Sequence, residues 1–188
     1  MEKITINKDF KGKIFFTSDT HWRHGNIIKY CDRPFVNVQE MDHVLIQNWN
    51  KVVSKEDIVF HLGDFAFADK SKWRQIANSL NGTKYLVQGN HDRTDDIPTE
   101  CFEAVEDLMS LSIEYNNSWH KFILSHRPFL CFEGMFKDTK QLFGHCHSRN
   151  NNTGKDAYLL KYLVNSYDVG VDNNNFTPIS FEEILAKF

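Results

Sequence analysis

The stretch KYLVQGNHD, residues 84–92, decides the fold. Its apolar, β-rich run predicts a buried strand, and the polar turn that follows contains a glycine together with Asn, His and Asp. The same arrangement occurs in KIFFTSD at 13–19 and in DIVFHLGD at 57–64. These segments therefore predict three buried strands that carry polar side chains at their carboxyl ends.

Two later segments repeat this pattern. Residues 108–126 predict a hairpin around Asn116-Asn117 whose second strand ends in Ser-His. Residues 140–147, KQLFGHCH, predict another strand with a similar ending, and 163–172 predict one or two more. Ligands bind at the carboxyl ends of strands in open α/β sheets, so we expect the five polar endings to converge on one site.

Three segments predict helices. Residues 38–53 have apolar side chains at helical spacing, 70–80 follow the candidate N-cap Asp69, and 180–188 begin with a capping box formed by Ser180 and Glu183. Strands alternate with helices first and then follow one another directly. This order favours an α/β sandwich built around mixed sheets.

Length and charge restrict the possible organisation and partners. A chain of 188 residues favours a single domain over 1–188. The net charge of −3 provides no basic surface of the kind that drives nucleic-acid binding. This charge argues against a nucleic-acid partner without excluding one.

The cysteines and the apolar stretches bear on location. The four cysteines are dispersed and form no C-x-x-C pair, which indicates reduced thiols. No apolar stretch approaches the roughly 18 residues of a membrane span, and the N-terminal segment has no leader pattern. We therefore expect a cytoplasmic protein without a membrane partner; the oligomeric state stays open.

The strand endings form a series along the chain: SDTH (18–21), GD (63–64), GNHD (89–92), SH (125–126) and GHCH (144–147). This series resembles the signature of the calcineurin-like metallophosphoesterases. DTHWRHGNIIKYCDRPF (19–35) further resembles a subgroup of small phage and bacterial single-domain phosphoesterases. The family resemblance implies a four-layer α/β/β/α sandwich of mixed sheets and a centre of two divalent metal ions.

The resemblance also implies a ligand for each ion. One ion would bind Asp19, His21 and His147, the other would bind Asn90, His126 and His145, and Asp64 would bridge them. Two aspartates and one hydroxide against two divalent ions leave a charge of about +1, which favours a phosphate anion. We expect Mn²⁺, with Fe, Zn²⁺ or Ni²⁺ as alternatives.

The catalytic residues implied by the resemblance are His91 and Asp92. A metal-bridging hydroxide would attack phosphorus in line, while His91 polarises the phosphate or protonates the leaving oxygen as a general acid. Asp92 would orient the His91 ring. The expected substrate is a phosphate ester, with a nucleotide as one candidate, and we favour a phosphodiester over a monoester.

Residues near the signature supply candidate substrate contacts. These are Arg23, His24, Asn26, Arg33 and Arg127, which suit the recognition of phosphate oxygens. Phe132 and Phe136, in the aromatic segment 129–138, would either stack on a substrate ring as part of a flap or belong to the core. We favour the core for them.

Other interpretations remain for parts of the pattern. Alone, Gly63-Asp64 would be a capped turn, and GHCH would be half of a structural zinc site.

Cys146 fills the variable position of GHCH and is not expected to bind metal. The following run, 148–155, predicts a loop on the rim of the site. His61 is predicted to be a hydrogen-bonded core residue. Competing functions are a nuclease and a non-catalytic metal-binding scaffold of the same fold.

Overall fold

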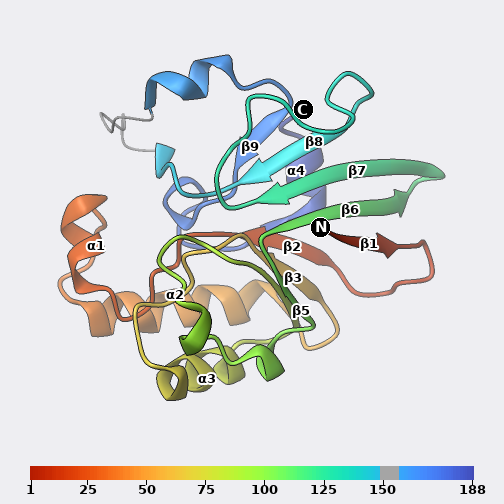
Figure 1. Cartoon of the computed structure of the whole chain (residues 1–188). Coiled ribbons are helices and arrows are strands. Elements are labelled where there is room, and N and C mark those ends of the chain that lie inside the picture. Colours follow the sequence, from red (N-terminus) through yellow and green to blue (C-terminus); the bar gives the residue numbers. More distant parts are fainter. Residues whose placement is uncertain (149–156) are drawn as a thin grey trace.

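The computed structural model describes residues 1–148 and 157–188, and it contains two five-stranded mixed sheets that face each other (Figure 1). Residues 149–155 of the predicted rim loop lie outside the described residues. The mixed α/β class and the pair of mixed sheets are confirmed. None of the helices in the described part of the chain is both long and apolar enough to cross a membrane.

The first sheet contains most of the strands predicted from the N-terminal half. Its order is β10 (Ile179–Ser180), β2 (Ile14–Thr17), β3 (Ile58–His61), β4 (Thr83–Val87) and β5 (Ala104–Glu106). Strands β2 to β5 run parallel to one another, and β10 is antiparallel at the edge. The carboxyl ends of four strands therefore meet at one edge of this sheet.

The second sheet is built around the predicted hairpin. Its order is β1 (Glu2–Ile6), β6 (Leu108–Tyr115), β7 (Ser118–Ser125), β8 (Lys140–Phe143) and β9 (Ser166–Asp168). Strands β6 and β7 are antiparallel, and both turn residues, Asn116 and Asn117, have positive φ, as a type I′ turn requires. Strands β7, β8 and β9 run parallel, so their carboxyl ends also meet.

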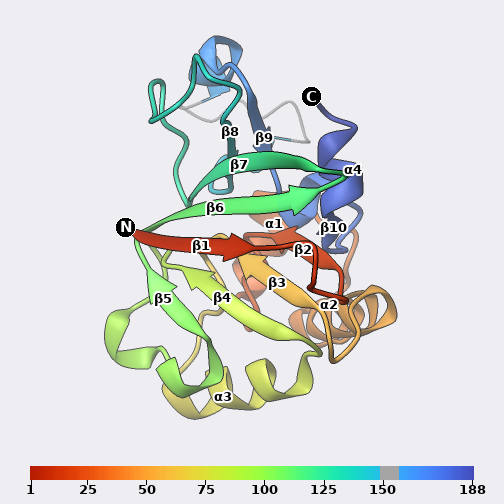
Figure 2. The ribbon, with the colours of Figure 1, turned by 90° about the vertical axis from the view of Figure 1, so that its right-hand side faces the viewer.

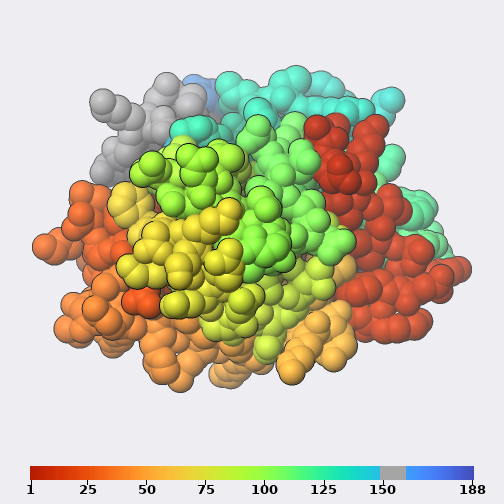
Figure 3. Space-filling model, turned by 60° about the horizontal axis from the view of Figure 1, so that its bottom comes forward, coloured from red at the N-terminus to blue at the C-terminus, as the bar shows by residue number. Residues whose placement is uncertain are grey.

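Helices α2 (Val38–Val52) and α3 (Lys70–Ser79) cover the outer face of the first sheet. Alternation along the strands sends Phe15, Val59 and Leu86 into this layer, where they pack among apolar side chains of both helices. The predicted cap Asp69 accepts a hydrogen bond from the Lys72 N–H. The 3₁₀ turns η1 (Thr94–Asp96) and η2 (Thr99–Cys101) contact α3 and complete this face (Figure 3).

The space between the sheets holds the other core. Phe16 and Phe60 from the first sheet pack there with Phe122 from the second. Helix α4 (Phe181–Leu185) follows edge strand β10, places Phe181 against the same cluster, and lies beside the ends of the hairpin strands (Figure 2). The predicted capping box at its start is confirmed.

The segment 129–138 differs from its prediction. Phe136 is 90% exposed and Phe132 is only partly buried, so the preference for the core is wrong. Together with Lys3 and Lys121 these residues line a hollow over the outer face of the second sheet. The segment lines no part of the pocket at the strand ends described below, which also argues against a flap over that pocket.

Three strands and one helix had no counterpart in the sequence prediction: β1, β5, β10 and helix α1 (Gly25–Tyr30). Strand β1 pairs with β6, far along the chain, and β5 has only three residues. The polar endings also lie beyond the strands themselves, since β3 ends at His61, β4 at Val87 and β8 at Phe143. The candidate site is therefore built from turns anchored on strands.

Candidate metal centre

The turns at the strand ends approach one another so closely that glycine is required. A Cβ atom at Gly89 would collide with the backbone N and the carboxylate of Asp64, and one at Gly144 would collide with Ser18 Oγ and the Asp19 carboxylate. Gly63 has a φ of 93°, a conformation that side-chain-bearing residues rarely adopt. The glycines of GD, GNHD and GHCH therefore let these turns pack together.

Backbone strain is concentrated in the same turns. Five of the seven predicted ligands have left-handed backbone conformations: Asp19 (57°), His21 (51°), Asp64 (54°), His145 (68°) and His147 (44°). Such conformations cost free energy and persist at functional sites where the surrounding structure enforces them. The consequence here is that side chains from separate turns face one another.

The first predicted ligand group is brought together. Ligand atoms of Asp19, His21 and His147 all lie within 4.8 Å of one another. Asp19 Oδ2 accepts hydrogen bonds from Ser18 Oγ (2.7 Å) and the His145 N–H (2.9 Å). Asp19 Oδ1 and His21 Nε2 are buried and have no hydrogen-bond partner among the described residues. Burying polar atoms in this state is costly, so this group fits a bound cation.

The second group joins residues from both sheets. Ligand atoms of Asp64, His126 and His145 also lie within 4.8 Å of one another. His126 Nδ1 donates to the Leu62 carbonyl (2.8 Å), which leaves Nε2 directed at Asn90 Oδ1, 3.0 Å away. A hydrogen bond of this kind at one ring nitrogen is typical of histidines that bind metal through the other. All four predicted members of this group are adjacent.

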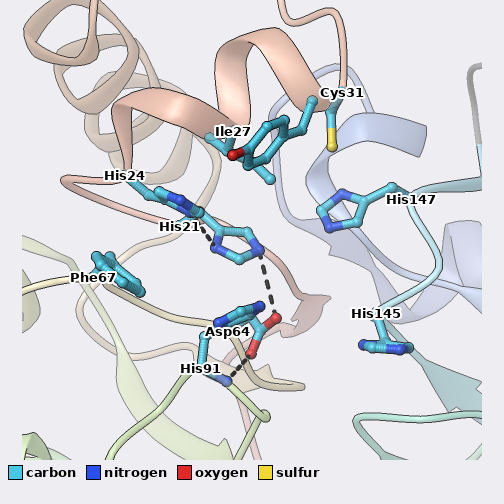
Figure 4. Close-up of a pocket in the computed structure, with 10 residues that line it drawn as sticks. His21, His24, Ile27, Cys31, Asp64, Phe67, His91, His145 and His147 are labelled. Atoms are coloured by element: carbon cyan, nitrogen blue, oxygen red, sulfur yellow. Dashed lines mark hydrogen bonds and ion pairs between the residues drawn. The ribbon is translucent and has the colours of Figure 1, made fainter.

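Asp64 lies between the two groups. Its Oδ2 is 3.5 Å from His21 Nε2 and 3.4 Å from His126 Nε2, while its Oδ1 accepts the His91 N–H at 2.9 Å. One carboxylate oxygen therefore faces a candidate ligand from each group (Figure 4 shows Asp64 with His21). This is the position that a bridging ligand must occupy.

Burial and neighbouring charged groups shift the pKa values of several candidate ligands. Burial lowers the pKa of both His126 and His147. For His126, the hydrogen bond to Asp64 and the charges of Asp19 and Asp64 more than compensate and raise the pKa to about 9. For His147, the Asp19 charge and hydrogen bonds to Asp172 and Cys31 raise the pKa to about 11. Burial raises the pKa of Asp19. For Asp64, burial is outweighed by the His126 hydrogen bond, which holds the pKa below its usual range. Without metal, protons on imidazoles supply the positive charge that this centre needs.

His147 is supported by a pair of residues that the sequence analysis did not connect. Its Nδ1 donates to Asp172 Oδ2 (2.7 Å), and Asp172 accepts two hydrogen bonds from Arg33, at 2.8 and 2.9 Å. The Arg33 guanidinium also donates to the carbonyls of Thr20 and Asp19. Arg33 is thus buried behind the ligands, which corrects its expected contact with substrate.

Asp92 also has a different role from the one expected. Its carboxylate accepts hydrogen bonds from the backbone N–H groups of Asp64, Phe65 and Gly89, all at 2.8 Å. Among the described residues these backbone N–H groups, and not the His91 ring, are the hydrogen-bond partners of the Asp92 carboxylate. It joins the Gly63-Asp64 turn to the 89–92 turn instead. Burial raises its pKa to about 6.

His91 lies at the edge of a pocket of about 570 Å³ that opens on the metal groups (Figure 4). Its side chain is exposed, and its ring centroid is 5.6 Å from that of His21. The residues that line this pocket are His21, His24, Ile27, Tyr30, Cys31, Asp64, Phe67, His91, His145 and His147. His91 therefore meets the pocket from outside the ligand groups, where a proton donor to substrate would have to be.

Of the remaining predicted substrate contacts, only His24 lines the pocket. Its Nδ1 is 3.2 Å from His21 Nδ1. The Arg23 side chain pairs with Asp42 at 3.3 Å. Asn26 and Arg127 are exposed and are not among the pocket residues. The structure therefore keeps His24 as a candidate and gives no support to the other three.

The cysteines separate into two cases. Cys146 is buried in the turn between His145 and His147 and belongs to none of the three groups of candidate metal ligands found among the described residues. Cys31, which the sequence analysis left out of the site, lines the pocket and lies near His147 and Asp172 (Figure 4). The sequence offers no pattern that would have identified Cys31, because its neighbours are distant along the chain.

Comparisons with known proteins identify a family and several similar chains. A model of the calcineurin-like phosphoesterase family matches residues 12–177. An uncharacterised protein of Methanocaldococcus jannaschii is 38% identical over 176 residues, which cover 92% of this chain and 89% of that protein. The Gene 66 protein of Mycobacterium phage D29 is 31% identical over 160 residues, which cover 72% of this chain and 79% of the phage protein. A solved structure from Aquifex aeolicus, of a protein of unknown function, matches with a TM-score of 0.70 at 29% identity, covering 95% of this chain and all of that one.

Proposed function

The chain belongs to the calcineurin-like phosphoesterase family, and from that premise we propose that it hydrolyses a phosphoric diester at a centre of two divalent metal ions. The observation that carries this proposal is the position of Asp64. One of its oxygens lies within 3.5 Å of His21 Nε2 and of His126 Nε2, which belong to different ligand groups. A single-ion or structural zinc site has no use for a carboxylate in that position.

The proposed ligands are those predicted from the family resemblance. Asp19, His21 and His147 would hold one ion, and Asn90, His126 and His145 the other, with Asp64 shared. When bound, the ions would neutralise the phosphate and activate the attacking water. The mixed nitrogen and oxygen ligands are compatible with Mn²⁺, Fe, Zn²⁺ and Ni²⁺, and we propose Mn²⁺ as the native metal.

The side chains around the ions would have separate tasks. Asp172 and Arg33 would hold the His147 ring, and Leu62 O would hold the His126 ring, so that each presents Nε2 to the centre. His91, exposed at the pocket edge, would donate a proton to the leaving oxygen. A cytoplasmic location stays a prediction, in keeping with four dispersed cysteines that form no C-x-x-C pair.

The test is hydrolysis of a generic aryl phosphodiester and the matching monoester by protein loaded with Mn²⁺. We expect turnover of the diester, its loss in chelator, and its recovery when Mn²⁺ is restored. Asp64→Asn should abolish turnover, whereas His43→Ala, at an exposed position of α2, should not. A protein that binds two ions and hydrolyses neither ester would instead be a non-catalytic scaffold.

A further inference from the structure

Two aromatic rings stand at the open edge of the metal pocket. Phe67 and His24 are stacked, with centroids 4.7 Å apart and ring planes 19° from parallel. Figure 4 shows the pair beside His91 and the metal ligands. Phe67 is 55% exposed, although its near neighbour Phe65 is completely buried. Phe67 therefore offers aromatic surface to a ligand beside the polar site.

The backbone holds Phe67 in place. Its N–H donates to the Trp22 carbonyl at 2.8 Å, and Trp22 in turn donates to Phe65 O at 3.0 Å. The two turns that carry Phe67 and His24 therefore run side by side from the ligands Asp64 and His21. The ring is presented on a fixed support, which lowers the entropic cost of binding against it.

Phe67 separates two hollows that share His91. The metal pocket contains both Phe67 and His24. A second hollow of about 310 Å³ contains Phe67, His91 and Arg93 without His24. Because His24 does not line it, the second hollow reaches Phe67 without contacting the stacked His24 ring. A phosphate in the metal pocket would thus have a path past His91 onto an open aromatic surface.

The distances connect this surface with the leaving group. The His91 ring centroid is 6.3 Å from the ring centroids of both Phe67 and His24. Arg93 directly follows the GNHD turn, and its side chain is 82% exposed. Its planar guanidinium supplies a second flat group at the hollow. Aromatic faces and guanidinium planes are the two surfaces on which nucleobases stack.

We infer that the substrate is a phosphoric ester whose leaving group carries a flat ring such as a nucleobase, and that this ring stacks on Phe67 in the hollow beside Arg93. This inference rests on the proposed function, because it takes His91 to be at the leaving oxygen. It names a substrate class, a nucleoside phosphate ester, and makes Phe67 the residue that selects it.

The test measures direct binding of two probes to the Mn²⁺-loaded protein by calorimetry. Adenosine 5′-monophosphate and ribose 5-phosphate share the sugar and the phosphate and differ only in the base. We expect the nucleotide to bind roughly tenfold more tightly, as one stacked base provides. Phe67→Ala should bring the ratio close to one without changing ribose 5-phosphate binding, and Phe67→Trp should keep or increase it.

Phe136→Ala is the matched control, because that phenylalanine is also exposed but lies on the 129–138 segment, away from both hollows. It should leave the ratio unchanged. Equal binding of the two probes to the unmodified protein, or a ratio that survives Phe67→Ala, would overturn the inference. Failure of the proposed function would give a different result. The protein would hydrolyse neither ester, but its ratio of nucleotide to ribose 5-phosphate affinity would still depend on Phe67.

Discussion

The Arg33 guanidinium and the Asp172 carboxylate face each other through two hydrogen bonds, although 139 residues separate them in the chain. Both side chains are buried, and Asp172 also accepts a hydrogen bond from His147 Nδ1. Because Arg33 also donates to the Asp19 carbonyl, a single guanidinium contacts one proposed ligand directly and supports a second, His147, through Asp172. Arg33 is therefore a positioning residue.

Arg33→Lys should weaken metal binding. Lysine keeps the charge but loses the planar fork that contacts Asp172 with two nitrogens, so the His147 ring loses its support. We expect the affinity for the first ion to fall about 10-fold to 100-fold, measured by titration with Mn²⁺. Arg23→Lys is the control, because the Arg23 side chain is largely exposed and pairs with the buried Asp42 outside the metal pocket. If the Arg33 variant bound metal with unchanged affinity but had a raised KM, Arg33 would instead contact the substrate.

Asp92→Asn should destabilise the fold as well as reduce activity. An asparagine side chain has one acceptor oxygen, so its amide group would face a backbone donor that Asp92 now satisfies. A buried donor without an acceptor costs about 1–3 kcal/mol, which urea unfolding would measure. If unfolding were unchanged and only kcat fell, Asp92 would act on His91 after all.

His91→Ala should separate catalysis from metal binding. The ring is exposed and belongs to neither ligand group, so both ions should remain bound. Loss of a general acid lowers turnover by about 100-fold to 10,000-fold. Metal content by elemental analysis and kcat are the two measurements, with His43→Ala as the control. A variant that loses an ion would place His91 among the ligands.

His61 should make stability dependent on pH. It is completely buried, its Nε2 is bonded to Thr20 Oγ1, and burial lowers its pKa to about 3. Thr20 Oγ1 also bonds to the Phe65 carbonyl, where it must be the donor, so His61 Nε2–H donates to it and Nδ1 carries no proton. Neutral His61 is thus the folded form.

The unfolded state, with a histidine pKa of about 6.5, binds the proton more readily. The stability from neutral His61 is therefore fully present above pH 6.5 and is lost as pH falls toward 3, by about 2 kcal/mol between pH 7 and 5. His61→Gln lacks this dependence, so its stability deficit relative to the parent should shrink at pH 5. Urea unfolding in chelator measures both proteins, and parallel pH profiles would contradict the prediction.

Cys146→Ser should leave both ions in place. The thiol lies between two proposed ligands in sequence but belongs to no candidate ligand group among the described residues. Because Cys146 is buried, we expect a small fall in the unfolding temperature and an unchanged metal stoichiometry. Loss of one ion from the serine variant would identify the sulfur as a ligand.

Much of the fold was accessible from sequence because local patterns encode it. The hairpin at Asn116-Asn117 and the caps Asp69 and Ser180 depend on nearby residues, and all were predicted and are found. Strand β1 was missed because its charged sequence has no apolar run, and its position depends on pairing with the distant β6. The proximity of the proposed ligands was predictable only through a family pattern, since spacing alone does not bring Asp19 to His147.

The supporting residues were not predictable for a related reason. Asp172 contacts His147 and Arg33 only after β9 and the α1 region fold toward the same strand ends. Asp92 was misassigned because its neighbour in sequence is His91, whereas its hydrogen bonds go to Asp64, Phe65 and Gly89. The roles of Asp172 and Asp92 both depend on contacts between turns, and such contacts leave no periodic pattern in the sequence.

The closely packed turns give the centre a mechanical role as well. Asp19, Asp64 and Asn90 follow strands of one sheet, whereas His126 and His145 follow strands of the other. Ions held between them would act as removable cross-links across the sandwich. Loading the protein with metal would then tie the opening of one sheet to that of the other, so amide hydrogens on both sheets would exchange together rather than separately.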